Sequence, residues 1–201
     1  MNQRQTAMAA SRAAIVQAAG ATFAVHGYEG ASFSRVAEAM GRPKSAVGYH
    51  LFPSKLALAV AVIERQQERW AETEAALTEP AGVERLTAML LATSLATRTD
   101  PLAAGAVRLL HELLHSESEV PRGFVWATFV RAQLEAAAAR AGLSADAVPP
   151  GAEHLLLEAT FGLVTTGRRD DDQELATRLR TLWTALLSSF GLPDAAARVV
   201  H

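Results

Sequence analysis

The sequence predicts an all-α protein of about nine helices, and three observations support this. Apolar residues recur at the three- and four-residue spacing of a helix face along most of the chain. No sustained alternation of β-branched and polar residues indicates a strand. Glycine and proline interrupt the apolar pattern at intervals, where one helix would stop and the next begin, at 79–82, 100–101, 121, 141–142 and 149–151.

The composition limits the classes of function. Half of the 201 residues are hydrophobic, enough for a sizeable core in one domain or two. The chain has no cysteine, which excludes disulfides, thiol catalysis and cysteine-ligated zinc. The sequence shows neither the run of about 20 apolar residues that a membrane span needs nor the apolar run of a signal peptide. We therefore expect a cytoplasmic protein with no membrane partner.

Charge is divided unevenly along the chain. Residues 1–60 contain six basic and two acidic side chains, a net charge of +4, and include both lysines, Lys44 and Lys55. Residues 61–201 contain thirteen basic and nineteen acidic side chains, a net charge of −6. A basic segment favours a nucleic-acid partner, although ordinary surface charge is the alternative.

The basic segment predicts three short helices. The first covers about 9–25 and ends at Gly27, which can adopt a left-handed conformation. The second begins with Ser32 as its cap and stops at Gly41. The third begins at Pro43, whose fixed φ suits a first helical position, and reaches about residue 50. Two short helices joined by a tight glycine turn and braced by a longer one form a helix-turn-helix unit.

Three stretches carry a family resemblance, which covers about residues 10–60. They are 27–29 (GYE), 32–37 (SFSRVA) and 41–55 (GRPKSAVGYHLFPSK). The segment resembles the DNA-binding signature of the TetR family of bacterial transcription regulators. The resemblance implies a DNA-binding domain over 1–54, a helical ligand-binding and dimerisation domain over 55–201, and a palindromic double-stranded operator bound by a homodimer.

The resemblance also implies which residues contact DNA. Ser32, Lys44 and Lys55 are expected to hold phosphate oxygens. Base edges are expected to meet the third helix at Ser45, Gly48, Tyr49 and His50. Val47 is expected in the core.

The segment departs from the family pattern at three positions. Arg42 stands where the family has an apolar residue and is a poor helix cap, so we assign it to phosphate. Leu51 lengthens the stretch between the turn glycine and Phe52 by one residue, and this changes the register around Tyr49. Gly48 often has a tyrosine as its family counterpart and weakens the helix by about 1 kcal/mol relative to alanine.

Beyond residue 53 the pattern predicts about six more helices, the first of which bridges the two domains. The last two, at about 152–166 and 173–190, carry leucine stripes, including Leu155 and Leu163 on the first. In the TetR family these two helices of each subunit form a four-helix dimer interface. A stripe that packs only inside the subunit is the alternative.

The second half also resembles the γ-butyrolactone receptors, a subgroup of the family, at 100–109, 124–126 and 182–187. This implies an apolar pocket for a lactone effector, in which Trp126 packs on the ring and Gln133 and Thr165 supply polar contacts. A core role for Trp126 and an antibiotic or another lipophilic compound as effector are the alternatives. The family resemblance also implies that the protein is a repressor.

One motif indicates a different class of protein. His111, Glu112 and His115 fit the H-E-x-x-H pattern of zinc proteases, with Glu135 as the only tolerably spaced third ligand. Helices rich in Leu, Glu and His match this pattern by accident, and no strand is predicted that could hold a peptide. A non-catalytic metal site and plain packing remain open. Other catalytic motifs are missing, so we expect no enzymatic activity, no metal and no cofactor.

Overall fold

The computed structural model describes residues 3–47, 51–113, 123–166, 171–192 and 195–199, and all regular structure in these ranges is helical. The chain divides into two compact units, unit 1 from Met1–Trp70 with Ala96–Gly123 and unit 2 from Ala71–Leu95 with Phe124–His201. In these ranges eight α-helices have seven residues or more, and α9 (Ala195–Arg198) adds a single turn. The predicted all-α class is confirmed, and the predicted count of nine is slightly high for full helices.

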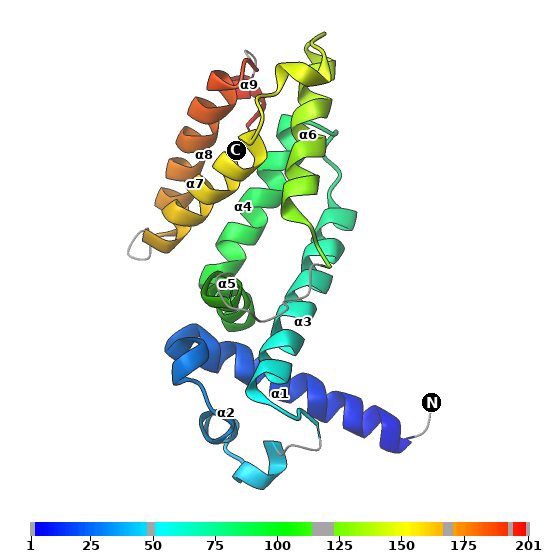
Figure 1. Cartoon of the computed structure of the whole chain (residues 1–201), viewed down its shortest axis with the longest axis vertical. Coiled ribbons are helices and arrows are strands. Elements are labelled where there is room, and N and C mark those ends of the chain that lie inside the picture. The colour runs from blue at the N-terminus through cyan, green and yellow to red at the C-terminus, as the bar shows by residue number, and fades with distance from the viewer. Residues whose placement is uncertain (1–2, 48–50, 114–122, 167–170, 193–194, 200–201) are drawn as a thin grey trace. The chain divides into compact units, whose positions relative to one another are not determined.

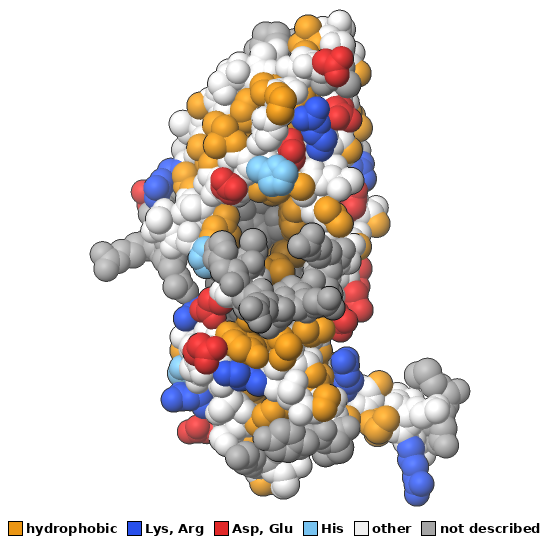
Figure 2. Space-filling model, viewed as in Figure 1, with side chains coloured by type: hydrophobic (Ala, Val, Ile, Leu, Met, Phe, Trp, Pro, Cys, Tyr) orange, Lys and Arg blue, Asp and Glu red, His pale blue; other side chains and the backbone are white. Residues whose placement is uncertain are grey.

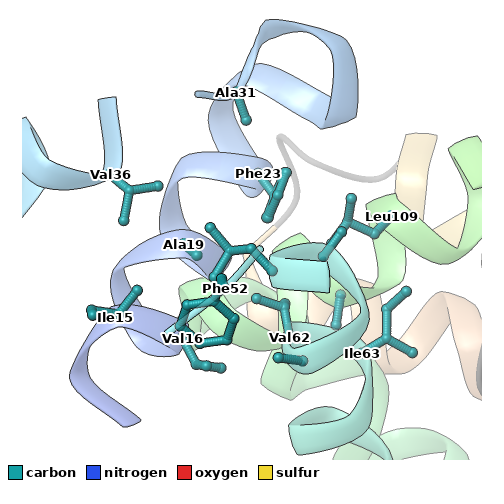
Figure 3. Close-up of a cluster of buried hydrophobic side chains, with 14 of the residues drawn as sticks. Ile15, Val16, Ala19, Phe23, Ala31, Val36, Phe52, Val62, Ile63 and Leu109 are labelled. Atoms are coloured by element: carbon teal, nitrogen blue, oxygen red, sulfur yellow. The ribbon is translucent and has the colours of Figure 1, made fainter. Parts of the chain in front are cut away.

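Unit 1 contains the helices α1, α2, α3 and α5 and the short 3₁₀ helix η1. Their bounds are α1 (Gln3–Gly30), α2 (Phe33–Ala39), η1 (Lys44–Val47), α3 (Lys55–Ala76) and α5 (Pro101–Leu113), with the end of α3 belonging to unit 2. Side chains from all five elements pack into one apolar core, part of which Figure 3 shows. Phe23, Phe52 and Leu109 are almost fully buried there. The core joins the N-terminal segment 1–54, which we call the head, to α5, a helix from much later in the chain.

α1 has a backbone break near its end. Gly27 has φ 67° and ψ −176°, a conformation essentially confined to glycine, as its predicted role at the end of the first helix requires. The helix begins earlier than predicted, and its first turns project from unit 1 with exposed side chains (Figures 1 and 2). By length and composition α1 is the one described helix that could cross a membrane, which is weak evidence because core helices pass the same test.

The helix predicted from Pro43 to about residue 50 is of a different type where the structure describes it. The described part contains only the 3₁₀ helix η1 at this point, and residues 48–50 lie outside the described ranges. Gly41, at φ 61°, ends α2 as predicted, because the N–H groups of Gly41 and Arg42 bond back to the carbonyls of Glu38 and Ala37. Gly48, which favours a helix less than alanine by about 1 kcal/mol, directly follows η1.

α5 and α1 approach each other through two glycines. A Cβ placed on Gly105 would lie 2.0 Å from the carbonyl oxygen of Gly20, and one on Gly20 would lie 2.7 Å from Leu102 Cα. Glycine is therefore required on both sides of this crossing, because any side chain would push the two backbones apart. This crossing holds the middle of α5 against α1.

Unit 2 is built from α4, α6, α7, α8 and α9. The bounds of its longer helices are α4 (Val83–Thr99), α6 (Trp126–Arg140), α7 (Ala152–Thr166) and α8 (Asp172–Ser189), with the end of α4 belonging to unit 1. α7 and α8 agree closely with the two helices predicted for dimerisation. Trp183 is fully buried between them, and its indole N–H donates to Thr160 Oγ1 at 2.9 Å.

Candidate nucleic-acid interface

Ser32 lies at the start of α2, as predicted. Its Oγ accepts a hydrogen bond of 3.3 Å from the amide N–H of Arg35, and the residue is exposed. A serine hydroxyl that accepts such a bond still has its own O–H to donate. The position therefore offers both a hydroxyl and the N–H groups of a helix end to an anion.

Arg42 acts on the preceding helix through its backbone. Its amide N–H bonds to Ala37 O at 2.9 Å, which satisfies one of the last carbonyls of α2, and its side chain is exposed. Sequence reasoning identified Arg42 as a poor cap for the next helix, and the structure uses its N–H to close the previous one. The side chain is left to face solvent.

The predicted base-reading residues lie in and after η1. Ser45 is exposed, whereas Val47 is fully buried, as predicted for a core position. Lys44 begins η1. Gly48, Tyr49 and His50 lie outside the described residues, so their roles stay predictions.

Lys55 begins α3, which Ser54 caps by accepting a hydrogen bond of 3.0 Å from Ala57 N–H. The Lys55 ammonium lies 4.4 Å from the centre of the Tyr28 ring, a cation–π contact. It also lies 3.8 Å from Glu29 Oε2 and 3.4 Å from Glu29 O. Burial, and secondarily the Glu29 carboxylate, raises the pKa of Tyr28, so the ring facing the lysine is neutral.

The Lys55–Glu29 pair is well placed to exchange one partner for another. The Glu29 side chain is 93% exposed and that of Lys55 is 30% exposed. An exposed ion pair at this distance is weak, so a phosphate could replace the carboxylate at little cost. The contact with Tyr28 would keep the ammonium in place during the exchange.

Two further arginines of the head were missed by sequence reasoning. The Arg12 guanidinium lies 5.0 Å from the centre of the buried Phe52 ring, and Arg35 Nη1 lies 3.4 Å from His26 Nε2. Both arginines are exposed. Arg12 precedes the three stretches on which the family resemblance was recognised, and nothing in the periodicity pairs it with Phe52.

The H-E-x-x-H motif has a different use in the structure. Glu112 accepts hydrogen bonds from Arg108 Nε at 2.7 Å and from the amide N–H of Tyr28 at 2.5 Å. His111 is exposed, and His115 lies outside the described residues. Among the residues that the structure describes, no three histidine or acidic side chains are grouped so that they could hold a metal ion.

The predicted effector residues lie in unit 2. Trp126 begins α6 and forms an aromatic trio with Phe124 and Phe129, at ring-centre distances of 5.0 Å and 6.1 Å from Trp126. Gln133 is buried, and its Oε1 accepts a hydrogen bond of 3.0 Å from Gly82 N–H. Thr165 is exposed near the end of α7, and its hydroxyl donates to Phe161 O at 2.8 Å. Trp126 and Gln133 thus lie on α6 and Thr165 lies on α7, and the hydrogen bonds of Gln133 and Thr165 given above go to other residues.

Known proteins are similar to this chain both in its N-terminal segment and over most of its length. Residues 15–62 match the family model "Bacterial regulatory proteins, tetR family". A search of curated proteins found no match. One solved structure, which concerns the molecular basis for control of antibiotic production by bacterial hormones, is 32% identical, with a TM-score of 0.67 over 90% of this chain and 95% of that chain.

Two further solved structures share the fold. The TetR family protein CprB from S. coelicolor A3(2) is 22% identical, with a TM-score of 0.68 over 94% of this chain and 97% of that chain. A γ-butyrolactone receptor described as ArpA-like is 22% identical, with a TM-score of 0.65 over 96% and 97% of the two chains.

Proposed function

This chain belongs to the TetR family of bacterial regulatory proteins, and from that premise we propose that it is a cytoplasmic repressor. It binds a palindromic double-stranded operator as a homodimer and is released by a small apolar effector. The observation that carries the proposal is the match of residues 15–62 to the family's DNA-binding model, together with the net charge of +4 on residues 1–60.

The DNA-contacting part is residues 1–54 together with Lys55. Ser32, Arg42, Lys44 and Lys55 hold phosphate, and Ser45 with the stretch 48–50 reads bases. The exposed Ser32 cap and the exchangeable Lys55–Glu29 pair support the phosphate roles. The remaining residues, 55–201, dimerise and sense the effector.

Dimerisation occurs through α7 and α8. Small or apolar residues are exposed on these two helices among more numerous polar ones: Leu155 is 49% exposed, Ala185 is exposed, and a Cβ on Gly162 would meet nothing within 4 Å. Figure 2 shows hydrophobic side chains on the outer surface of this part of the chain. Small residues on an exposed helix face allow close approach by a second copy, and a two-fold dimer matches a palindrome.

The effector is a γ-butyrolactone or a compound of similar size and polarity. Phe124 and Trp126, which are half-buried, pack with the buried Phe129 and offer aromatic faces and an indole N–H, which suit an apolar ring with a carbonyl. Bacterial hormones that control antibiotic production are the subject of the structure that is 32% identical. Gln133 serves this site through the backbone, since its amide holds Gly82.

Release of DNA follows from a change in the spacing of the two heads. α3 starts at Lys55 in unit 1, and its last residues, 71–76, belong to unit 2, so this helix is the element through which we propose that the two sites are coupled. Typical coupling between linked sites is about 1–3 kcal/mol, which would weaken operator affinity roughly 5- to 150-fold.

The test is selection of bound DNA from a random pool, with and without candidate lactones and antibiotics. We expect a palindromic consensus whose retention is lost when the effector is present. Failure to retain any double-stranded sequence at low ionic strength would refute DNA binding. Equal retention with every compound would refute the effector class alone.

A further inference from the structure

The last two turns of α5 are bonded to the place where α1 breaks. Arg108 Nη1 donates to the carbonyl oxygens of Ala24 at 3.0 Å and Val25 at 3.1 Å. Glu112, one turn later on α5, accepts hydrogen bonds from the amide N–H of Tyr28 at 2.5 Å and from Arg108 Nε at 2.7 Å. One ion pair on α5 therefore bonds to the backbone on both sides of Gly27.

The signs of these two charges match the backbone groups that they meet. A helix ends with carbonyls that have no partner and starts with N–H groups that have none. Arg108 supplies a cation and donors to the carbonyl end before the break, and Glu112 supplies an anion and an acceptor to the N–H after it. The pair thus stabilises the backbone both before and after the break at Gly27.

The pair also closes around Gly27. A Cβ there would lie 2.5 Å from Glu112 Oε1 and 2.6 Å from Arg108 Nη2. The backbone at position 27 is therefore held in place by two side chains of α5, in addition to the conformation that glycine allows there.

The residues directly after the break hold Lys55. The Tyr28 amide is bonded to Glu112, while its ring contacts the Lys55 ammonium at 4.4 Å from the ring centre. Glu29, the next residue, offers Lys55 both its carbonyl and its carboxylate. A continuous set of contacts therefore runs from Arg108 and Glu112 to the start of α3.

α5 is firmly placed at its other end. Asp100 accepts the amide N–H of Leu102 at 2.9 Å and pairs with Arg69 of α3. The glycine crossing of Gly20 and Gly105 fixes the middle of α5 against α1. A pair that projects from a helix fixed in this way can impose its position on the break.

We propose that Arg108 and Glu112 are positioning residues for DNA binding: by bonding to both sides of the break at Gly27, they set the place of the Tyr28 ring and so of the Lys55 ammonium. This rests on the proposed phosphate role of Lys55. It gives the glutamate of the H-E-x-x-H motif a role in operator binding, through its effect on Lys55.

The experiment measures operator affinity of the full-length protein as a function of salt, with the DNA selected from the random pool. The variants are Glu112→Ala, Glu112→Gln, Arg108→Lys, Lys55→Ala and the double variant Glu112→Ala with Lys55→Ala. Glu135→Ala is the matched control, because Glu135 forms the equivalent i,i+4 pair with Arg131 at 2.8 Å on α6. Thermal unfolding and circular dichroism of each variant identify any that fail to fold.

We expect Glu112→Ala to weaken operator binding about 2- to 30-fold and to lower the salt slope, whereas Glu135→Ala changes neither. Glu112→Gln, which keeps an acceptor for Tyr28 N–H, should restore part of the loss. In the Lys55→Ala background the Glu112→Ala change should have little further effect, because both act through one contact. If Glu112→Ala does not fold, Glu112→Gln and Arg108→Lys are measured for the same non-additivity.

Two results would overturn the proposal, and they can be told apart. If Lys55→Ala lowers affinity and salt slope but Glu112→Ala behaves as Glu135→Ala does, or its effect simply multiplies with that of Lys55→Ala, the positioning role is wrong and DNA binding stands. If Lys55→Ala changes neither quantity, the phosphate role of Lys55 and the positioning role fall together.

Discussion

The amide N–H of Tyr28 and the carboxylate of Glu112, which are 84 positions apart in the chain, are joined by a hydrogen bond of 2.5 Å. Tyr28 belongs to the DNA-binding signature and Glu112 to a helix far beyond it. Specific bonds to α5 therefore cross the boundary that the sequence predicts at residue 54, between the DNA-binding domain and the rest of the chain.

Gly27→Ala should lower the free energy of unfolding by about 1–3 kcal/mol for its backbone conformation alone, since ψ near 180° at positive φ is almost confined to glycine. Crowding by Glu112 and Arg108 should add about 1–3 kcal/mol. Chemical denaturation measures both. Gly142→Ala is the control, because Gly142 also has positive φ, at 75°, but a Cβ there meets nothing within 4 Å. A loss for Gly27→Ala no larger than that for Gly142→Ala would contradict the added cost expected from the ψ value and the crowding together.

Gly105→Ala should destabilise the protein by about 1–3 kcal/mol or more, because the added methyl would lie 2.0 Å from Gly20 O and the helices would have to separate. Gly20→Ala should have a similar effect through Leu102. The double variant should lose less than the sum, since one separation relieves both contacts. A strictly additive loss in thermal unfolding would contradict a shared crossing.

Glu112→Gln should change the pH dependence of stability in acid. Burial by itself raises the pKa of Glu112, but the hydrogen bond from Tyr28 N–H, the bonds and charge of Arg108 and the charge of His111 together hold the pKa below its ordinary value of 4.5. A carboxylate with a lowered folded-state pKa stabilises the protein above its unfolded pKa, and this stability is lost as pH falls through the folded value.

The stability difference between wild type and Glu112→Gln should therefore be constant from about pH 7 to pH 5 and shrink below about pH 4.5. Urea denaturation at several pH values measures it, with Glu135→Gln as the matched loss of one carboxylate on α6. A difference that grows on acidification would refute the assignment.

Lys44→Ala should weaken DNA binding about equally for all sequences and lower the slope of log affinity against log salt by about one, as loss of a phosphate contact does. Fluorescence anisotropy with the selected operator and a scrambled duplex would measure both. A loss restricted to particular operator sequences would instead make Lys44 a base reader.

Ala185→Arg should weaken the homodimer about 30-fold or more, because it would place two guanidinium groups in the two-fold contact proposed for α7 and α8. Ala139→Arg is the matched control, since Ala139 is an exposed alanine on α6. Sedimentation velocity at micromolar concentration compares the variants with wild type. A dimer that persists in Ala185→Arg would place the interface elsewhere.

Local signals in the sequence predicted much of the fold. Gly27 and Gly41 stop helices because only glycine adopts their positive φ without strain, and both positions were read correctly. Ser32 caps α2 because its short side chain reaches an N–H three residues later. The helical spacing of apolar residues gave α7 and α8 almost to the residue.

The sequence by itself thus determined the all-α class, the ends of the head's first two helices and membership of the TetR family, because these depend on spacing and on single residues. Tertiary structure decided what the charged side chains meet. Glu112 matches a metal motif by its neighbours in sequence, yet its partners are Arg108 and the backbone of Tyr28. Packing of α5 against α1 brings these residues together, and no pattern along one helix encodes a contact between two.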